Sequence, residues 1–166
     1  GVEGREVRLH LLDAGEGSSV LDDKLRELLD GQRLDSLVML SNTEVCRRAA
    51  CIVDERVPLV YTPLFEGVGL PAWVHAIGET PGMQLLPAIA WMTGRHRTRR
   101  WYLLGNDYSW PRCSHAAAMP FLRASGCEVV GERYVPLGAR DFDAVIADIS
   151  AMRADVVLLS LLAGDA

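Results

Sequence analysis

The chain has 166 residues, 49% of them hydrophobic and 23% charged, which is the composition of an ordinary globular protein with room for one core or two small ones. Its formal net charge of −5 argues against a nucleic-acid partner, because binding nucleic acid requires a basic stripe. No apolar run approaches the roughly 20 residues that a membrane-spanning helix needs.

Short apolar runs alternate with helical periods along the chain. Residues 7–12 predict a strand, and the leucines at 21, 25, 28 and 29 predict one face of a helix that Gly31 ends. Further strands are predicted at 36–40, 58–61, 74–77, 101–104, 128–135 and 156–162, and further helices at 43–54, 82–93, 111–124 and 142–152. We expect Pro120 to kink or interrupt its helix, because it lacks a backbone donor.

Near-continuous apolar strands separated by amphipathic helices are typical of parallel sheets covered on both faces. The sequence therefore predicts an α/β fold with doubly wound parallel sheets and helices on both faces. The basic cluster at residues 95–100 lies where one βα series gives way to another. We interpret it as a solvated turn, with a phosphate-binding patch as the alternative, since basic side chains near a helix C-terminus are favoured by its dipole.

The four cysteines show no Cys-x-x-Cys spacing and no histidine at a zinc-binding interval. They are Cys46, Cys51, Cys113 and Cys127. We interpret them as free buried thiols, and we predict neither a metal site nor a cofactor.

Three enzyme classes lack their signatures. A receiver domain requires a lysine after a late strand, but the only lysine, Lys24, lies in an early helix pattern. A serine hydrolase, suggested by Gly105-Asn106-Asp107, would also need an aspartate three residues before a histidine, and none of the four histidines has one. A dinucleotide-binding turn would need a third glycine where Val20 stands. None of these three enzyme templates fits, and we predict no catalytic residues.

Loops that follow strands carry the candidate ligand contacts, because ligands of α/β sheets bind at the carboxyl ends of the strands. Ser41, Asn42 and Thr43 lead into a helix. Their side chains either cap this helix or, with its free N–H groups, hold a carboxylate or carbonyl oxygen. Residues 61–67 follow another strand, and their aromatics and single carboxylate either line a pocket or pack under a loop.

The most distinctive segment is 105–112, which connects a strand to a helix that Pro111 helps to start. Between them lie Tyr108 and Trp110. Two bulky aromatics exposed on such a loop are unfavourable unless they cover something. They either contact a ligand or pack across an interface between two lobes.

At these loops the sequence resembles the type I periplasmic-binding-protein family, in its amide, urea and branched-chain amino acid branch. Residues 105–112 match Gly-Ser-Asp-Tyr-x-(Tyr/Trp/Phe)-Pro-Arg, and residues 61–67 match Tyr-Pro-x-x-Tyr-Glu-Gly with departures at Thr62 and Phe65. The other similar segments are Arg47-Arg48-Ala49, residues 132–138 and Asp141-Phe142.

The resemblance implies two lobes that close on a small polar ligand. Family members begin with a strand and helix before the position of Arg5 and continue past Ala166. We therefore expect a fragment, with residues 1–98 as an incomplete first lobe and residues 99–166 as the opening of the second.

The resemblance also implies the site residues. The predicted ligand contacts are Ser41, Asn42, Thr43, Glu44, Tyr61, Pro63, Tyr108 and Trp110. Glu44 stands where the branch has a small hydroxyl, so its carboxylate favours a donor-rich or cationic ligand group.

The function implied is the substrate-binding component of an ABC transporter for small amides, urea or branched-chain amino acids. A membrane permease would read the closed form, and the full-length protein would be periplasmic or anchored outside the cell. The alternative is a cytoplasmic amide-sensing regulator with a protein partner. An α/β enzyme whose active site lies outside these residues is less favoured.

Overall fold

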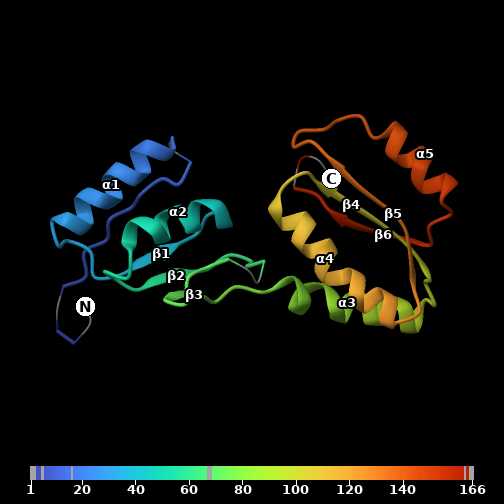
Figure 1. The fold of residues 1–166 in the computed structure, drawn as a ribbon, viewed down its shortest axis with the longest axis horizontal. Coiled ribbons are helices and arrows are strands. Elements are labelled where there is room, and N and C mark those ends of the chain that lie inside the picture. Colours follow the sequence, from blue (N-terminus) through green and yellow to red (C-terminus); the bar gives the residue numbers. More distant parts are fainter. Residues whose placement is uncertain (1–2, 5, 16, 67–68, 163, 165–166) are drawn as a thin grey trace. The chain divides into compact units, whose positions relative to one another are not determined.

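The computed structural model describes residues 3–4, 6–15, 17–66, 69–162 and 164. The chain forms two compact units, one from residues 1–63 and 68–78 and the other from residues 64–67 and 79–166 (Figure 1). The elements in chain order are α1 (Ser18–Asp30), β1 (Leu37–Met39), α2 (Thr43–Val53), β2 (Leu59–Tyr61), β3 (Val74–Ala76), α3 (Pro81–Arg95), β4 (Arg100–Asn106), α4 (Ser109–Ala124), β5 (Glu128–Val135), α5 (Asp143–Ala151) and β6 (Val156–Ser160).

The first unit contains a parallel sheet in the order β1-β2-β3, with Val38 opposite Val60 and Val60 opposite His75. Helices α1 and α2 pack on each other and lie on the same side of this sheet (Figure 1). The four predicted leucines of α1 are all buried, and Gly31 is its C-cap. Periodic burial of leucine therefore fixes which face of α1 points inward.

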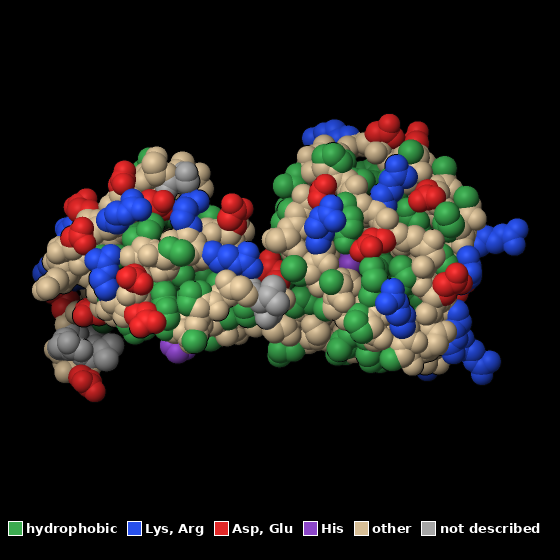
Figure 2. Space-filling view, in the orientation of Figure 1, with side chains coloured by type: hydrophobic (Ala, Val, Ile, Leu, Met, Phe, Trp, Pro, Cys, Tyr) green, Lys and Arg blue, Asp and Glu red, His purple; other side chains and the backbone are tan. Residues whose placement is uncertain are grey.

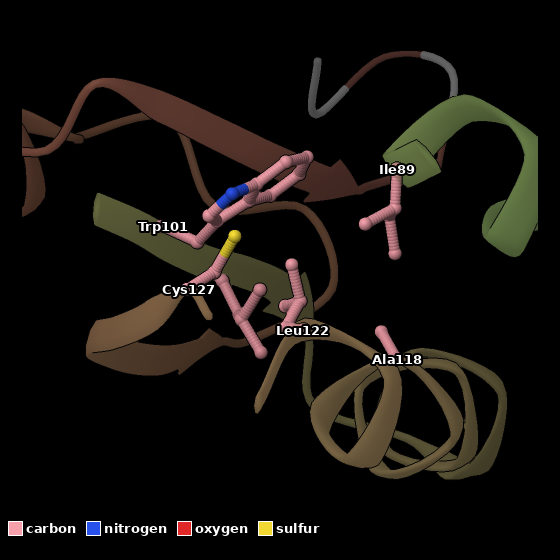
Figure 3. Close-up of a cluster of buried hydrophobic side chains, with 6 residues drawn as sticks. Ile89, Trp101, Ala118, Leu122 and Cys127 are labelled. Atoms are coloured by element: carbon pink, nitrogen blue, oxygen red, sulfur yellow. The ribbon is translucent and has the colours of Figure 1, made fainter. Parts of the chain in front are cut away.

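The second unit contains a parallel sheet in the order β5-β4-β6. Successive residues of its central strand point to opposite faces. Trp101 and Leu103 join a core with side chains of α3 and α4, part of which is drawn in Figure 3. Tyr102 and Leu104 join a second core with α5. This sheet is doubly wound, with helices on both faces, as the sequence predicts.

Helix α3 belongs to the second unit, so the units divide earlier in the chain than the basic cluster at residues 95–100. The reason is packing: Ile89 of α3 is buried in the same core as Trp101 and Leu122. The basic cluster instead joins two elements of one unit. Its Arg99 and Arg100 N–H groups donate to Asp155 Oδ2 at 2.8 and 2.9 Å, and these bonds lower the pKa of Asp155.

The strand predicted at residues 7–12 does not form. These residues have neither strand structure nor hydrogen bonds within the part of the chain that the structure describes, and Val7, Leu9 and Leu11 are exposed. An alternating apolar pattern becomes a strand only where another strand satisfies its backbone groups.

The interruption predicted at Pro120 is also absent, because α4 continues through it to Ala124. Pro120 and Ala116, four residues earlier, are both exposed. The Ala116 carbonyl group, which has no N–H donor at Pro120, therefore lies on the solvent side of the helix, where water can bind it.

Acidic and basic side chains are interspersed over the outer surfaces of α1 and α2 on the face shown in Figure 2. This distribution matches amphipathic helices with one solvated side. Among the described residues, no helix combines the length and the apolar character needed to cross a bilayer.

Truncating the centre of the second unit should destabilise it. Leu103 is fully buried, so Leu103→Ala leaves a cavity and should lower the free energy of unfolding by about 2–5 kcal/mol. Leu137→Ala, at a leucine that is 56% exposed, is the matched control and should have little effect. Urea denaturation of both variants measures the difference, and equal effects would contradict the assignment of this core.

Candidate ligand-binding site

The loop between β4 and α4 begins at a glycine that permits close packing. A Cβ atom at Gly105 would lie 2.6 Å from Cβ of Pro111 and 3.2 Å from Cε1 of His115. Asn106, the next residue, is fully buried, and its Oδ1 accepts a 2.8 Å hydrogen bond from the N–H of Leu162. The base of the loop is therefore held to both α4 and the segment after β6.

Tyr108 and Trp110 form an aromatic pair on this loop. Tyr108 is the N-cap of α4 and Trp110 lies in its first turn. The ring centroids are 6.2 Å apart and the ring planes are tilted by 44°, within the favourable range for aromatic pairs. The Trp110 indole N–H is inaccessible to solvent and has no acceptor among the described residues, so it is a buried donor whose hydrogen bond is unmade.

Glu66 lies beside this pair within the second unit. Its Oε1 accepts a 3.3 Å hydrogen bond from the Ser109 hydroxyl, and Phe65 is held by a 2.8 Å bond from its N–H to the carbonyl oxygen of Glu79. Burial, together with the charge of Glu66, raises the pKa of Tyr108. Residues 61–67 are thus shared between the two units, and Gly67 lies outside the described residues.

A polar network supports the loop. Both Nε and Nη2 of Arg112 donate to Asp107 Oδ1, at 2.9 and 2.7 Å, and the Arg112 guanidinium lies 4.0 Å from the ring centroid of Tyr134. The Tyr134 hydroxyl donates to Glu132 Oε1 at 2.6 Å and lies 3.0 Å from Nδ1 of His115. Because the Arg112–Asp107 pair is half-exposed and screened by solvent, it contributes little to stability, and its main effect is to orient the loop.

His115 is the buried end of this network. It is 0% exposed, and its Nε2 has no hydrogen-bond partner in the described structure. Burial lowers its pKa below the ordinary value of 6.5, against the opposing influence of Glu132. Burial and the hydrogen bond to Glu132 raise the pKa of Tyr134, so both groups are neutral near pH 7.

The predicted contacts of the first unit are largely occupied with each other. Asn42 is the N-cap of α2, and its Oδ1 accepts from the N–H of Val45 at 2.9 Å. Thr43 is buried, and its Oγ1 lies 3.2 Å from the Tyr61 hydroxyl, which donates to the carbonyl oxygen of Ser41 at 2.9 Å. Asn42 therefore caps α2, while Tyr61 links the end of β2 to Ser41 and Thr43, which follow β1.

Glu44 is more exposed than Pro63. Glu44 is exposed in the first turn of α2, where its carboxylate is favoured by the helix dipole. The Pro63 backbone packs so closely on Gly78 that any side chain at position 78 would collide with the Pro63 carbonyl group. The structure thus groups Ser41, Thr43 and Tyr61 in one unit and Tyr108 with Trp110 in the other, while their contact with a ligand stays a prediction.

The supporting residues were not identified as site residues from sequence. Glu132 and Tyr134 carried a usable signal, because residues two apart on a strand share one face. His115 carried none, since its burial depends on the close approach at Gly105. Among the described residues, no three His, Cys, Asp or Glu side chains are grouped to hold a metal ion. The cysteines there form no disulfide; Cys46 and Cys127 are buried, Cys51 is exposed and Cys113 is intermediate, so the expectation of burial fails for Cys51.

Comparison with known proteins gives a family match over the whole chain. The profile described as periplasmic binding protein matches residues 1–166. Forty-five solved chains match this chain. The three reported below share under 25% sequence identity with it, so they establish likeness of fold alone.

Three solved structures illustrate the likeness. An R. palustris ABC transporter solute-binding protein in complex with benzoate has a TM-score of 0.74 at 15% identity, covering 98% of this chain and 46% of its own. An ABC transporter substrate-binding protein from Sphaerobacter thermophilus has a TM-score of 0.78 at 21% identity, with coverages of 95% and 45%. A branched-chain amino acid ABC transporter protein from Thermus thermophilus with bound valine has a TM-score of 0.75 at 15% identity, with coverages of 92% and 41%. The chain thus spans less than half the length of these proteins.

A side chain at Gly105 should disturb the loop. Gly105→Ala forces the start of α4 away from β4 and should lower the free energy of unfolding by about 1–3 kcal/mol. Gly94→Ala, in α3 with open space around it, should instead stabilise the protein by about 0.5–1 kcal/mol. Thermal denaturation of the two variants checks that one substitution lowers the stability of the protein and the other raises it.

Buried His115 should make stability depend on pH. Because its pKa is lower in the folded protein, the unfolded chain binds the extra proton, and stability should fall as the pH drops below about 6.5. His115→Gln should flatten that part of the profile, leaving the steeper loss from carboxylate titration at lower pH. Denaturation curves of both proteins, recorded between about pH 7.5 and about pH 5 in steps of about half a pH unit, measure how the free energy of unfolding changes with pH. Parallel profiles for the two proteins would refute a buried neutral imidazole.

Proposed function

Because the chain belongs to the periplasmic binding protein family, we propose that it forms part of the solute-binding component of an ABC transporter. The observation that carries the proposal is the Tyr108–Trp110 pair, fixed at the carboxyl end of β4 by Gly105 and Asn106. In a doubly wound sheet this is the edge at which ligands bind. The role assigned is binding without catalysis.

The ligand proposed is a small molecule that combines an apolar part with a polar head. The aromatic pair offers flat apolar surface, and the unpaired Trp110 N–H offers a donor to a carbonyl or carboxylate oxygen. Amides, urea and branched-chain amino acids are the classes that the sequence favours. Benzoate and valine, bound by two proteins of similar fold, add small carboxylates as candidates.

Contacts from the first unit would select among these ligands. Glu44 is exposed at the start of α2, and a carboxylate there favours ligands with ammonium or amide donors. An α-amino acid presents both an ammonium group and a carboxylate. Among the candidates, a branched-chain amino acid carries an apolar side chain for the aromatic surface and a carboxylate for the Trp110 donor.

Closure of the full-length protein on its ligand would shift an open–closed equilibrium by the ligand's differential affinity for the two forms. A membrane permease would read the closed form, in a periplasmic or externally anchored protein. Fractionation of cells that express the full-length protein tests the setting, and a cytoplasmic location would instead favour a ligand-sensing regulator with a protein partner.

Ligand binding itself is tested on the full-length protein by thermal shift with valine, leucine, acetamide, urea and benzoate. A ligand at about 100 times its dissociation constant should add about 2.7 kcal/mol of stability. Trp110→Ala should weaken binding at least about tenfold, a loss of about 1.4 kcal/mol. Trp91→Ala, at a half-exposed tryptophan of α3, is the matched control and should bind normally. Absence of a shift with every ligand would overturn the proposal.

A further inference from the structure

Exposed arginines gather at one end of the second unit. Helices α3, α4 and α5 end there, and β4, β5 and β6 begin there, because the strands are parallel and the helices run back along the sheet. Figure 2 shows Lys and Arg side chains gathered where α3 and α4 end. We call this surface the basic end, and its exposed arginines are Arg95, Arg97, Arg99, Arg123 and Arg153.

Hydrogen bonds hold the turns of the basic end together. Nε and Nη2 of Arg100 donate to the carbonyl oxygens of Arg153 and Met152, at 3.1 and 2.8 Å. The Cys127 thiol donates to the Thr98 carbonyl oxygen at 3.6 Å. The turns that follow α3, α4 and α5 are therefore neighbours, and their arginines form one surface.

The carboxylates at this end are already engaged. Glu128 Oε2 accepts from Arg100 Nη1 at 2.6 Å, and Asp155 accepts from the backbone N–H groups of Arg99 and Arg100. Within the described residues, none of the five exposed guanidinium groups forms an ion pair. Each of the three helix C-termini adds roughly half a negative charge, which offsets only part of the five positive charges. The basic end is therefore strongly positive, in a chain whose net charge is −5.

Apolar side chains lie among these arginines. Trp91 of α3 is 56% exposed, and its ring centroid lies 4.6 Å from that of His96 in edge-to-face geometry. Met152, whose carbonyl oxygen accepts from Arg100, is 41% exposed. Tryptophan beside arginine is typical of surfaces that meet lipid headgroups, because the ring enters the apolar boundary while the guanidinium stays in the polar layer.

We propose that the basic end binds the surface of a membrane that contains anionic phospholipids. Guanidinium groups form paired hydrogen bonds to phosphate oxygens. Each arginine near an anionic bilayer multiplies the partition coefficient about fivefold. An acidic protein surface would attract the same charges, but it offers no fluid apolar layer to Trp91 and Met152.

The candidate ligand-binding loop lies at the other end of the same central strand. β4 runs for seven residues from Arg100 to Asn106, so its two ends are about 20 Å apart. The basic end and the aromatic pair are therefore separate surfaces, and each can be occupied without the other. Membrane contact is thus independent of the solute that the loop binds.

Sedimentation with vesicles tests this proposal on the full-length protein. Vesicles of phosphatidylcholine with about 30% phosphatidylglycerol should bind at least about tenfold more protein than vesicles of phosphatidylcholine alone. Salt at about 0.5 M should remove the difference, because it screens the charges. Equal binding to both vesicles would overturn the proposal. Loss of vesicle binding in about 10 mM inorganic phosphate at constant ionic strength would overturn it too, since a soluble anion would then be the ligand.

Two triple variants with the same change in net charge separate the basic end from charge in general. Arg95→Gln/Arg97→Gln/Arg153→Gln should lower binding to the anionic vesicles at least about tenfold. The matched control replaces with glutamine three exposed arginines of the first unit, which are Arg26, Arg33 and Arg56. This control should bind like the parent protein, and equal losses in the two variants would overturn the proposal. Retention on a polyglutamate column without any vesicle binding would assign the basic end to an acidic protein instead, which also overturns it.

Tryptophan fluorescence gives a second measurement. Brominated acyl chains quench tryptophan rings that enter the lipid, so brominated anionic vesicles should quench the full-length protein. Trp91→Phe should remove at least about half of this quenching, because Trp91 is the ring beside the exposed arginines. Quenching that the variant leaves unchanged would overturn the proposal.

Discussion

The close approach of α4 to β4 at Gly105 is the contact on which the candidate site depends. Without a side chain at this position, Pro111 and His115 pack directly against the end of the strand. The first turn of α4 then presents Trp110 beside Tyr108, and buried Asn106 ties the same point to the segment after β6. Backbone geometry, more than any side-chain bond, positions the aromatic pair.

The polar network acts on this geometry from the other side. Arg112 connects Asp107 on the loop to the ring of Tyr134 on β5, while His115 reaches the Tyr134 hydroxyl from within α4. Three elements that meet at the loop are thereby bonded to one another. Because His115 and Tyr134 are neutral near pH 7, the network avoids the cost of burying a charge.

Sequence patterns predicted most elements of the fold, because helix and strand periods report directly on which side chains are buried. The α1 leucines and the alternation along β4 are examples. Residues 7–12 show the limit of that inference: their pattern is that of a strand, but pairing depends on a neighbour that periodicity does not reveal. The packing of α3 with the second unit was not predictable for a similar reason, since the core that holds Ile89 is formed by residues distant in sequence.

The candidate site was predictable where chemistry follows local sequence. The Tyr108–Trp110 loop is of this kind, because a strand, a glycine and a helix-starting proline place it at the sheet edge. The hydrogen bond between Thr43 and Tyr61 was not predictable, because it joins the first residue of α2 to the last residue of β2, 18 residues later in the sequence. It gives Thr43 a structural contact within this unit, while its contact with a ligand stays a prediction.

The two units differ in how ready they are to bind. In the second unit the aromatic pair is fixed by bonds internal to that unit. Binding a ligand would therefore cost little entropy for ordering these two side chains. In the first unit the strand ends beside Glu44 rest on a sheet whose β1 edge is open. Local stability of a binding surface depends on the sheet beneath it. The second unit therefore holds its aromatic pair in a preorganised form, whereas the strand ends of the first unit rest on a sheet in which β1 is an edge strand.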